Sequence, residues 1–327
     1  MNSKINNIQV LRFFSIFSVM LAHLPLFGFG AWGVDFFFVI SGFMMMYITE
    51  DSYTHFLTKR FIRVVPLYWI LTMFVFSIAV FKPDFLNSTT ANFEHLFKSF
   101  FFIPFDKNGT GHSPILFLGW TLNFEILYYI LFSLSMWIFK KNRIYICSFA
   151  IVLVFLVSSF YSEKHFILKT YSDSIILEFI YGMIIFEFYK KKKINDENKF
   201  QIKSNDIIIV FFLFFLSSIF IYFNFPRVLS YGFLGTSLLY FILIFVNNNF
   251  FSKVFVVLGD ACFSIYLIHP YVIQFFYKFF KLNNTDLSDN LLATFLSITV
   301  TLFLSILIYR TIERPLNHKI KGYLKLK

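Results

Sequence analysis

The sequence predicts an all-α protein, a polytopic integral membrane bundle of about ten transmembrane helices with both termini in the cytoplasm. Of its 327 residues, 58% are hydrophobic and only 14% are charged, whereas soluble globular proteins are roughly 45–50% apolar and about 25% charged. The apolar residues form runs near the length of about 20 residues that a helix needs to cross the hydrocarbon core. Lys and Arg gather on one side of the connections between these runs, as expected of a multi-pass protein.

Helices are the expected spanning elements because the backbone must satisfy its own hydrogen bonds inside the bilayer. Arg12 interrupts the first apolar run and no small-residue cleavage site follows it, so we expect a membrane helix there rather than a signal peptide. The whole chain, residues 1–327, is expected to form a single transmembrane domain. Its expected helices are roughly 7–27, 31–49, 66–82, 115–138, 144–160, 174–189, 207–223, 228–246, 255–280 and 291–311, followed by a cytoplasmic tail at 312–327.

The orientation follows from the basic residues in the connections. With the N-terminus inside, and with Arg12 left out as intramembrane, 20 Lys and Arg fall on the cytoplasmic side and 8 fall outside. The net charge of +11 is therefore mostly topological, and no nucleic-acid partner is expected. Cys147 and Cys262 both lie in apolar segments, so a disulfide framework is not expected.

Two connections have features of their own. Residues 52–65 are too polar to span and are predicted to form an interfacial amphipathic helix with a basic face. The longest external connection, about 83–114, contains a stretch at 92–103 that can form a short helix.

Ionisable groups inside the spans are costly and are candidates for function. Eleven helical steps separate Arg12 from His23, which places them within about 20° of one face and about 16 Å apart along the axis. A histidine oriented by a carboxylate or a carbonyl is suited to general-base chemistry. Asp35 and Glu125 are the two candidate carboxylates, and Asp35 fits the depth of His23 better. The alternative for His23 is a buried histidine that donates to a backbone carbonyl.

Lys59, Arg60 and Arg63 lie together at the cytoplasmic end of a predicted span. Guanidinium groups suit phosphates, and the alternative reading is topology or lipid headgroup contact. His269 precedes Pro270 and can mark a helix kink. No group of side chains has the spacing of a metal site, so no metal is expected.

Six motifs in order along nearly the whole chain resemble those of the acyltransferase 3 family of bacterial membrane proteins. They are Arg12 with His23; Gly33–Phe43; Lys59–Trp69; Trp120–Glu125 followed by Tyr128-Tyr129; Phe263–Pro270; and Ile312–Pro315. The resemblance implies a ten-helix protein of the bacterial inner membrane. Such a protein moves an acyl group, usually acetyl from acetyl-CoA, onto a hydroxyl of a surface glycan such as O-antigen, capsule or exopolysaccharide. We expect the stand-alone type, without an extracytoplasmic hydrolase-like domain.

The resemblance also implies functional roles for His23 and Arg12, and it ties Arg60 and Arg63 to the donor. On this basis, acyl-CoA is expected to bind at the cytoplasmic mouth through Arg60, Arg63 and Lys59. Its arm would run past Arg12 toward His23, which would act as the general base with Asp35 or Glu125 as its partner. A covalent acyl-histidine is the less favoured route.

The remaining site candidates are polar groups for the oxyanion or the substrate: Ser41, Trp120, Tyr128 and His269. The expected partners are acyl-CoA, a glycan or lipid-linked glycan, and membrane lipids. The rival function is a transporter or flippase for a lipid-linked glycan. A third reading is a non-catalytic subunit of a polysaccharide machine. The sequence leaves open the acceptor sugar, the kind of acyl group and the oligomeric state.

Overall fold

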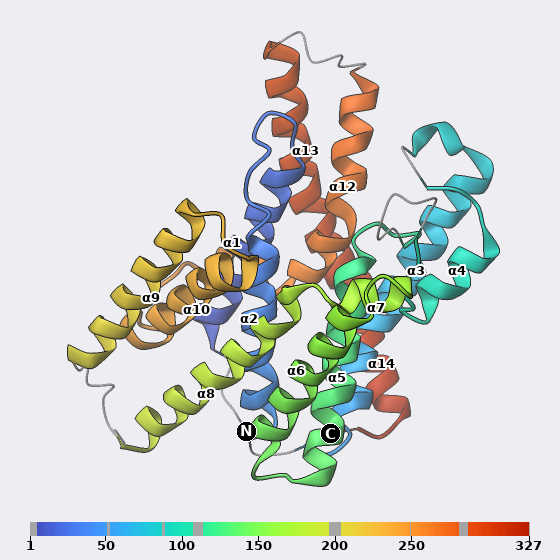
Figure 1. Ribbon diagram of the computed structural model, residues 1–327. Helices are drawn as coiled ribbons and strands as arrows, with labels where there is room; N and C mark the ends of the chain where they lie inside the picture. The colour runs from blue at the N-terminus through green and yellow to red at the C-terminus, as the bar shows by residue number, and fades with distance from the viewer. Residues whose placement is uncertain are drawn as a thin grey trace.

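The computed structural model describes residues 5–50, 53–86, 89–106, 114–195, 204–248, 250–280 and 287–326, although the side chains of 193–195 and 287–289 are not described. Within these ranges all regular elements are helical (Figure 1). The elements are α1 (Asn6–His23), α2 (Gly33–Ile48), α3 (Phe56–Phe81), η1 (Pro83–Phe85), α4 (Phe93–Phe100), α5 (Gly119–Ile138), α6 (Arg143–Phe160), α7 (Phe166–Tyr171), η2 (Ser174–Leu177), α8 (Glu178–Asn195), α9 (Ser204–Tyr222), α10 (Arg227–Phe245), α11 (Lys253–Asp260), α12 (Cys262–Phe279), α13 (Leu287–Ile308), η3 (Tyr309–Glu313) and α14 (Arg314–Tyr323).

The architecture is that of a membrane helical bundle. Six helices of the described chain are long and apolar enough to span a membrane, and the bent pair of α11 and α12 makes a seventh. These six are α3, α5, α6, α9, α10 and the continuous helix 290–323. Each of the ten segments expected from the sequence is helical, but the count of ten spans and the side on which the termini lie remain predictions. The short helix expected at 92–103 is confirmed as α4.

The expectation of a separate interfacial helix at 52–65 differs from what the structure shows. Helix α3 runs without a break from Phe56 to Phe81 and contains Pro66 in its interior. Phe56, Ile62 and Val64 of its first half are buried in the hydrophobic core, which a helix at the membrane surface would not achieve. The segment can join the bundle because its basic side chains face a polar pocket instead of hydrocarbon.

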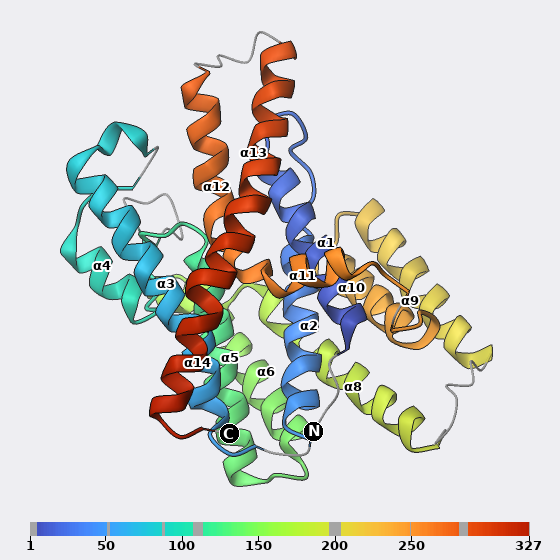
Figure 2. The ribbon, with the colours of Figure 1, turned by 180° about the vertical axis from the view of Figure 1, so that it is seen from behind.

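The expected single helix at 255–280 is broken. Helix α11 ends at Asp260, α12 begins at Cys262, and their axes differ by 74°. The break lets α11 cross α1 at Gly259, where an added Cβ would lie 1.9 Å from the carbonyl oxygen of Gln9. Beyond the break, α12 pairs with α13, and this hairpin rises above the rest of the molecule (Figures 1 and 2).

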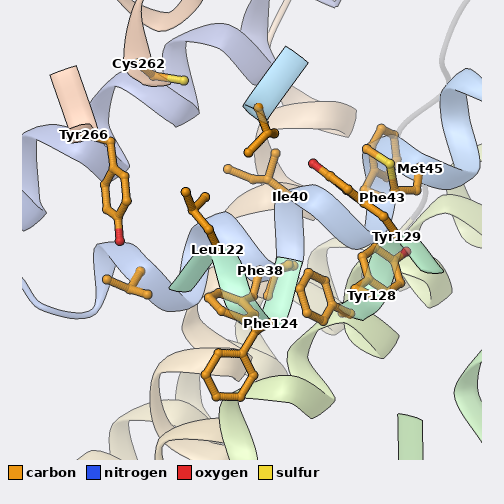
Figure 3. Close-up of a cluster of buried hydrophobic side chains, with 14 of the residues drawn as sticks. Phe38, Ile40, Phe43, Met45, Leu122, Phe124, Tyr128, Tyr129, Cys262 and Tyr266 are labelled. Atoms are coloured by element: carbon orange, nitrogen blue, oxygen red, sulfur yellow. The ribbon is translucent and has the colours of Figure 1, made fainter. Parts of the chain in front are cut away.

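Helix α2 is the central element, because α1, α8 and α10 all pack against it. Its closest neighbour is α8, and the two backbones meet at Gly42 and Gly182. An added Cβ on Gly182 would lie 1.9 Å from the Val39 carbonyl oxygen, and one on Gly42 would lie 2.1 Å from the Phe179 carbonyl oxygen. Small residues at a crossing allow such an approach between membrane helices. The rings of Phe38 and Phe43 pack beside this crossing (Figure 3).

Ion pairs hold α2 at both ends. Near its beginning, Asp35 is fully buried, and its two oxygens accept from Arg227 of α10 at 3.1 and 2.6 Å. Just beyond its end, Glu50 binds Lys190 of α8 at 2.6 Å and Arg143 of α6 at 3.2 Å. Partial burial opposes ionisation of Glu50, but Lys190 and Arg143 outweigh it and hold the pKa of Glu50 below its ordinary value. These three ion pairs fix α2 relative to three other helices.

We expect Gly182→Ala to lower the thermal unfolding midpoint of the detergent-purified protein, because the new methyl group overlaps the backbone of α2 and the two helices must separate. The matched control is Gly322→Ala on α14, where an added Cβ meets nothing within 4 Å. This control should unfold like the wild type. Equal midpoints for the two variants would contradict the tight crossing.

We expect Glu50→Gln to lower the unfolding midpoint at pH 7. The folded-state pKa of Glu50 is depressed, so its contribution to stability is present above the ordinary carboxyl pKa and is lost as pH falls below about 4. The difference from the wild type should therefore shrink on acidification. Glu94→Gln is the control, because Glu94 lies on exposed α4 and pairs only within its own helix. A difference that stays constant down to pH 3 would contradict the ion pair.

Candidate active site

A central cavity of about 70 Å³ lies between α1, α2, α3, α5, α8 and α12. Its wall is mainly apolar and aromatic, with a small number of polar groups at defined places. Four of the residues predicted from the sequence line it: Arg12, Ser41, Arg63 and Glu125. A largely apolar cavity with a few converging polar groups is the usual form of a small-molecule site.

A second, polar pocket of about 260 Å³ meets this cavity at Arg12 and Arg63, which line both spaces. Six Lys or Arg side chains and two carboxylates surround it, so its charge is strongly positive. Lys59, Arg60 and Arg63 therefore lie around one pocket with Arg12 of the first helix, as the sequence predicts. Its full lining is Gln9, Arg12, Lys59, Arg60, Arg63, Asp260, Tyr309, Glu313, Arg314, Asn317, His318 and Lys321.

In the described part of the chain, three arginines of this pocket have no carboxylate within ion-pair distance. Among the described residues, Arg12, Arg60 and Arg63 form no ion pair, and the buried Nε atoms of Arg12 and Arg60 have no hydrogen-bond partner. Arg60 also experiences the repulsion of both other guanidinium groups. Buried cations are normally paired, so this set fits an anionic ligand that carries several charges.

The far wall of the polar pocket is a feature that the sequence analysis missed. Arg314, His318 and Lys321 of α14 line it opposite the basic residues of α3. Their spacing of four and three residues puts them on one face of a helix, and that periodicity was the available signal. It was missed because the residues after 311 were expected to form a tail. In the structure, the π-helical turn η3 carries the helix of α13 directly into α14.

Glu125 faces the central cavity in a hydrogen-bonded setting. Its Oε1 accepts from Ser41 at 3.2 Å and also from Tyr129. Cys262 and Phe263, in the first turn of α12, also line the cavity. The cavity wall therefore includes both an anchored carboxylate and the first turn of a helix. Tyr129 and Cys262 are drawn with the rings that surround this region in Figure 3.

His23 lies outside the lining of the central cavity, beyond Tyr266 and Thr121. The Tyr266 hydroxyl is 2.6 Å from Thr121 Oγ1 and 3.1 Å from the carbonyl oxygen of Leu118, and the Tyr266 ring, which lines the cavity, lies 6.2 Å from the His269 ring between centroids. Behind this contact, His23 Nδ1 lies 2.8 Å from the Val19 carbonyl oxygen and 3.4 Å from His269 Nε2. The sequence singled out both histidines but gave no sign that they touch.

The carboxylate expected beside His23 is not there. Asp35 is bound to Arg227 of α10, and fully buried Glu178 of α8 lies next to it. Depth along the helices favoured Asp35 as the partner of His23, but depth says nothing about which way the side chain faces. Glu125 is held by Ser41 and Tyr129. Among the described residues, the orienting group of His23 is therefore a backbone carbonyl together with a second imidazole.

Two further predicted residues lie apart from both pockets. Tyr128 is fully buried, stacks on Phe179 with 4.0 Å between ring centroids, and sits in the aromatic cluster with Phe124 (Figure 3). Trp120 is half-buried in the first turn of α5 and meets Phe124 edge to face. Both side chains serve packing in this structure, since neither lines the cavity or the polar pocket.

The model of the acyltransferase 3 family, described as an acyltransferase domain, matches residues 5–310. The chain is also similar to the exopolysaccharide production protein ExoZ of Rhizobium meliloti (strain 1021), with 35% identity over 171 residues. That alignment covers 50% of this chain, and the chain spans about half (53%) of the length of the relative. No solved structure matches the chain. The chain therefore belongs to the acyltransferase 3 family.

Proposed function

We propose that this protein is a membrane O-acetyltransferase that moves acetyl from acetyl-CoA to a hydroxyl of a surface polysaccharide or its lipid-linked precursor. The observation that carries the proposal is the set of unpaired arginines in a cationic pocket that opens into a cavity of mixed character. Coenzyme A has the same division, with phosphate groups at one end and a long, nearly neutral arm at the other. The family membership supports acyl transfer, and the donor and the acceptor are our inference.

In this proposal the donor's phosphates occupy the polar pocket. Arg60, Arg63 and Lys59 hold them from α3, while Arg314 and Lys321 hold them from α14. Guanidinium forks suit phosphate oxygens, and the orphaned Nε donors of Arg12 and Arg60 gain acceptors. The neutral arm then enters the central cavity past Arg12 and carries the thioester toward Tyr266.

Transfer requires the thioester and the acceptor hydroxyl to meet at His23. The contact of Tyr266 with Thr121 stands between the cavity and the histidine, so the tyrosine has to turn aside when the donor is in place. The Nδ1–H group of His23 donates a hydrogen bond to the Val19 carbonyl oxygen, which leaves Nε2 as the basic nitrogen. Nε2 accepts the proton of the sugar hydroxyl as its oxygen attacks the carbonyl carbon. The C–S bond breaks, and the proton passes to the departing thiolate.

The similarity to ExoZ supports the proposed acceptor, and the distribution of Lys and Arg supports the proposed orientation in the membrane. ExoZ is named for exopolysaccharide production, which supports an exopolysaccharide acceptor here, with O-antigen and capsule as other members of the same class. We infer ten spans in the bacterial inner membrane, with both termini and the polar pocket on the cytoplasmic side, because the basic connections lie there. That side holds the acyl-CoA pool.

We expect His23→Ala to fold and bind the donor normally but to lose transfer by a factor of about 10²–10⁴, the usual contribution of a general base. The assay follows labelled acetyl from acetyl-CoA onto alkali-labile positions of the glycan. His165→Ala is the matched control, because His165 is exposed at the start of α7 and lines neither pocket. Turnover within a few-fold of the wild type in His23→Ala would remove His23 as the base.

We expect the pairs Arg60→Ala/Arg63→Ala and Arg314→Ala/Lys321→Ala each to raise the KM for acetyl-CoA about tenfold or more, because each pair removes charge-assisted hydrogen bonds to phosphate. The kcat at saturating donor should change much less. Lys319→Ala is the control, since Lys319 is exposed on the same helix and does not line the pocket. An unchanged KM in both pairs would mean that the basic residues serve topology alone.

The same assay separates the rival function. Labelled acetyl that appears on the glycan supports the enzyme. Movement of unmodified lipid-linked glycan across the membrane, without acetyl transfer, would support a transporter instead.

A further inference from the structure

His269 is a buried histidine with a defined protonation pattern. It lies in the middle of α12 and its side chain is fully buried. Its Nδ1 is 3.0 Å from the carbonyl oxygen of Ile265, one helical turn earlier. A carbonyl only accepts, so Nδ1 carries the hydrogen. In the neutral ring that burial favours, Nε2 of His269 is therefore left with an unshared lone pair.

That lone pair faces His23. The distance from His269 Nε2 to His23 Nδ1 is 3.4 Å, and the two rings meet edge to face with 5.0 Å between centroids. His23 Nδ1 also lies 2.8 Å from the carbonyl oxygen of Val19. Two acceptors thus converge on one nitrogen, which fixes the hydrogen on Nδ1. The other nitrogen of His23 is left free to accept a proton.

Among the described residues, few side chains contact the His23 ring besides His269. Besides the Val19 carbonyl and His269, the ring contacts Phe117 edge to face. Other titratable groups near α1 are engaged elsewhere or face other spaces. On α2 and α10, Asp35 and Arg227 bind each other, and Asp260 of α11 lines the polar pocket. On α12, Cys262 lines the cavity, Tyr266 is bonded to Thr121, Tyr271 accepts from the backbone N–H of Phe117, and Tyr277 is bonded to Thr294. Glu125 on α5 is bonded to Ser41.

We propose that His269 is a positioning residue for His23, holding its ring and its tautomer through an imidazole–imidazole hydrogen bond where histidine bases commonly use a carboxylate. This inference rests on the proposed role of His23 as the base. When His23 accepts the hydroxyl proton at Nε2, its Nδ1–H becomes a charged donor, and its bond to the His269 lone pair strengthens. No proton moves to His269. The protonated state is stabilised without a buried anion, whose desolvation would be costly in this part of the bundle.

Two substitutions separate positioning from packing. His269→Phe keeps a flat ring of similar size and removes both nitrogens, whereas His269→Gln keeps an amide oxygen that can accept from His23. We expect His269→Phe to lower kcat about 10–100-fold, the equivalent of losing a hydrogen bond to a charged group. The KM for acetyl-CoA should stay unchanged, because His269 lines neither the cavity nor the polar pocket. His269→Gln should recover most of the rate.

The pH dependence provides a readout that packing does not affect. Without its acceptor, protonated His23 is less stable, so the acid limb of the kcat/KM profile should move to lower pH in His269→Phe and stay in place in His269→Gln. A wild-type rate and profile in His269→Phe would overturn the inference, and so would equal losses in both variants with an unmoved acid limb. If His269→Phe unfolds, His269→Leu takes its place, with unfolding midpoints measured for every variant.

The failure of this inference is distinguishable from failure of the proposed function. Transfer that persists in His23→Ala removes the base itself. Transfer that needs His23 but is indifferent to His269→Phe removes only the positioning role.

Discussion

An ionised side chain inside a membrane bundle needs a partner of opposite charge or a polar cavity, because hydrocarbon supplies neither. Several charges in the described part of the bundle satisfy that condition by pairing. Asp35 binds Arg227, Glu50 binds Arg143 and Lys190, and Lys192 binds Asp206. Arg12, Arg60 and Arg63 do not pair among the described residues, and they are the ones around which the polar pocket forms. The position of the site thus follows from which charges the fold leaves unmatched.

The position of helix α2 determines the shape of the cavity. Its close crossing with α8 at Gly42 and Gly182 and the ion pairs at its two ends fix its position. Ser41, one residue from the crossing, then meets Glu125 on α5 and forms part of the cavity wall. A shift of α2 would alter the cavity and the packing core together. Asp35, expected as a catalytic carboxylate, contributes instead to this scaffold in the contacts it makes.

The sequence predicts the helices well because continuous apolar runs leave the backbone one way to satisfy its hydrogen bonds. It also places Arg12 and His23 on one face, since that depends only on helical spacing. It fails where the outcome depends on distant partners. The partner of Asp35 is 192 residues away, and the bend at Ala261 depends on how α11 crosses α1 at Gly259. The meeting of His23 with His269 requires knowing which faces of α1 and α12 are opposed. No local sequence pattern predicts any of these three features.

The hydrogen bond between Tyr266 and Thr121 has a consequence for the cell that is separate from chemistry. The cavity has a cationic pocket at one end and two imidazoles beyond the other. A continuous chain of polar groups between them would conduct protons through the bilayer. In the part of the chain that the structure describes, two hydroxyl groups and the surrounding rings stand between those halves. For the acyltransferase that we propose, such a separation would prevent a continuous polar path across the membrane while the cavity is empty. Acyl transfer at this site would then not discharge the ion gradient.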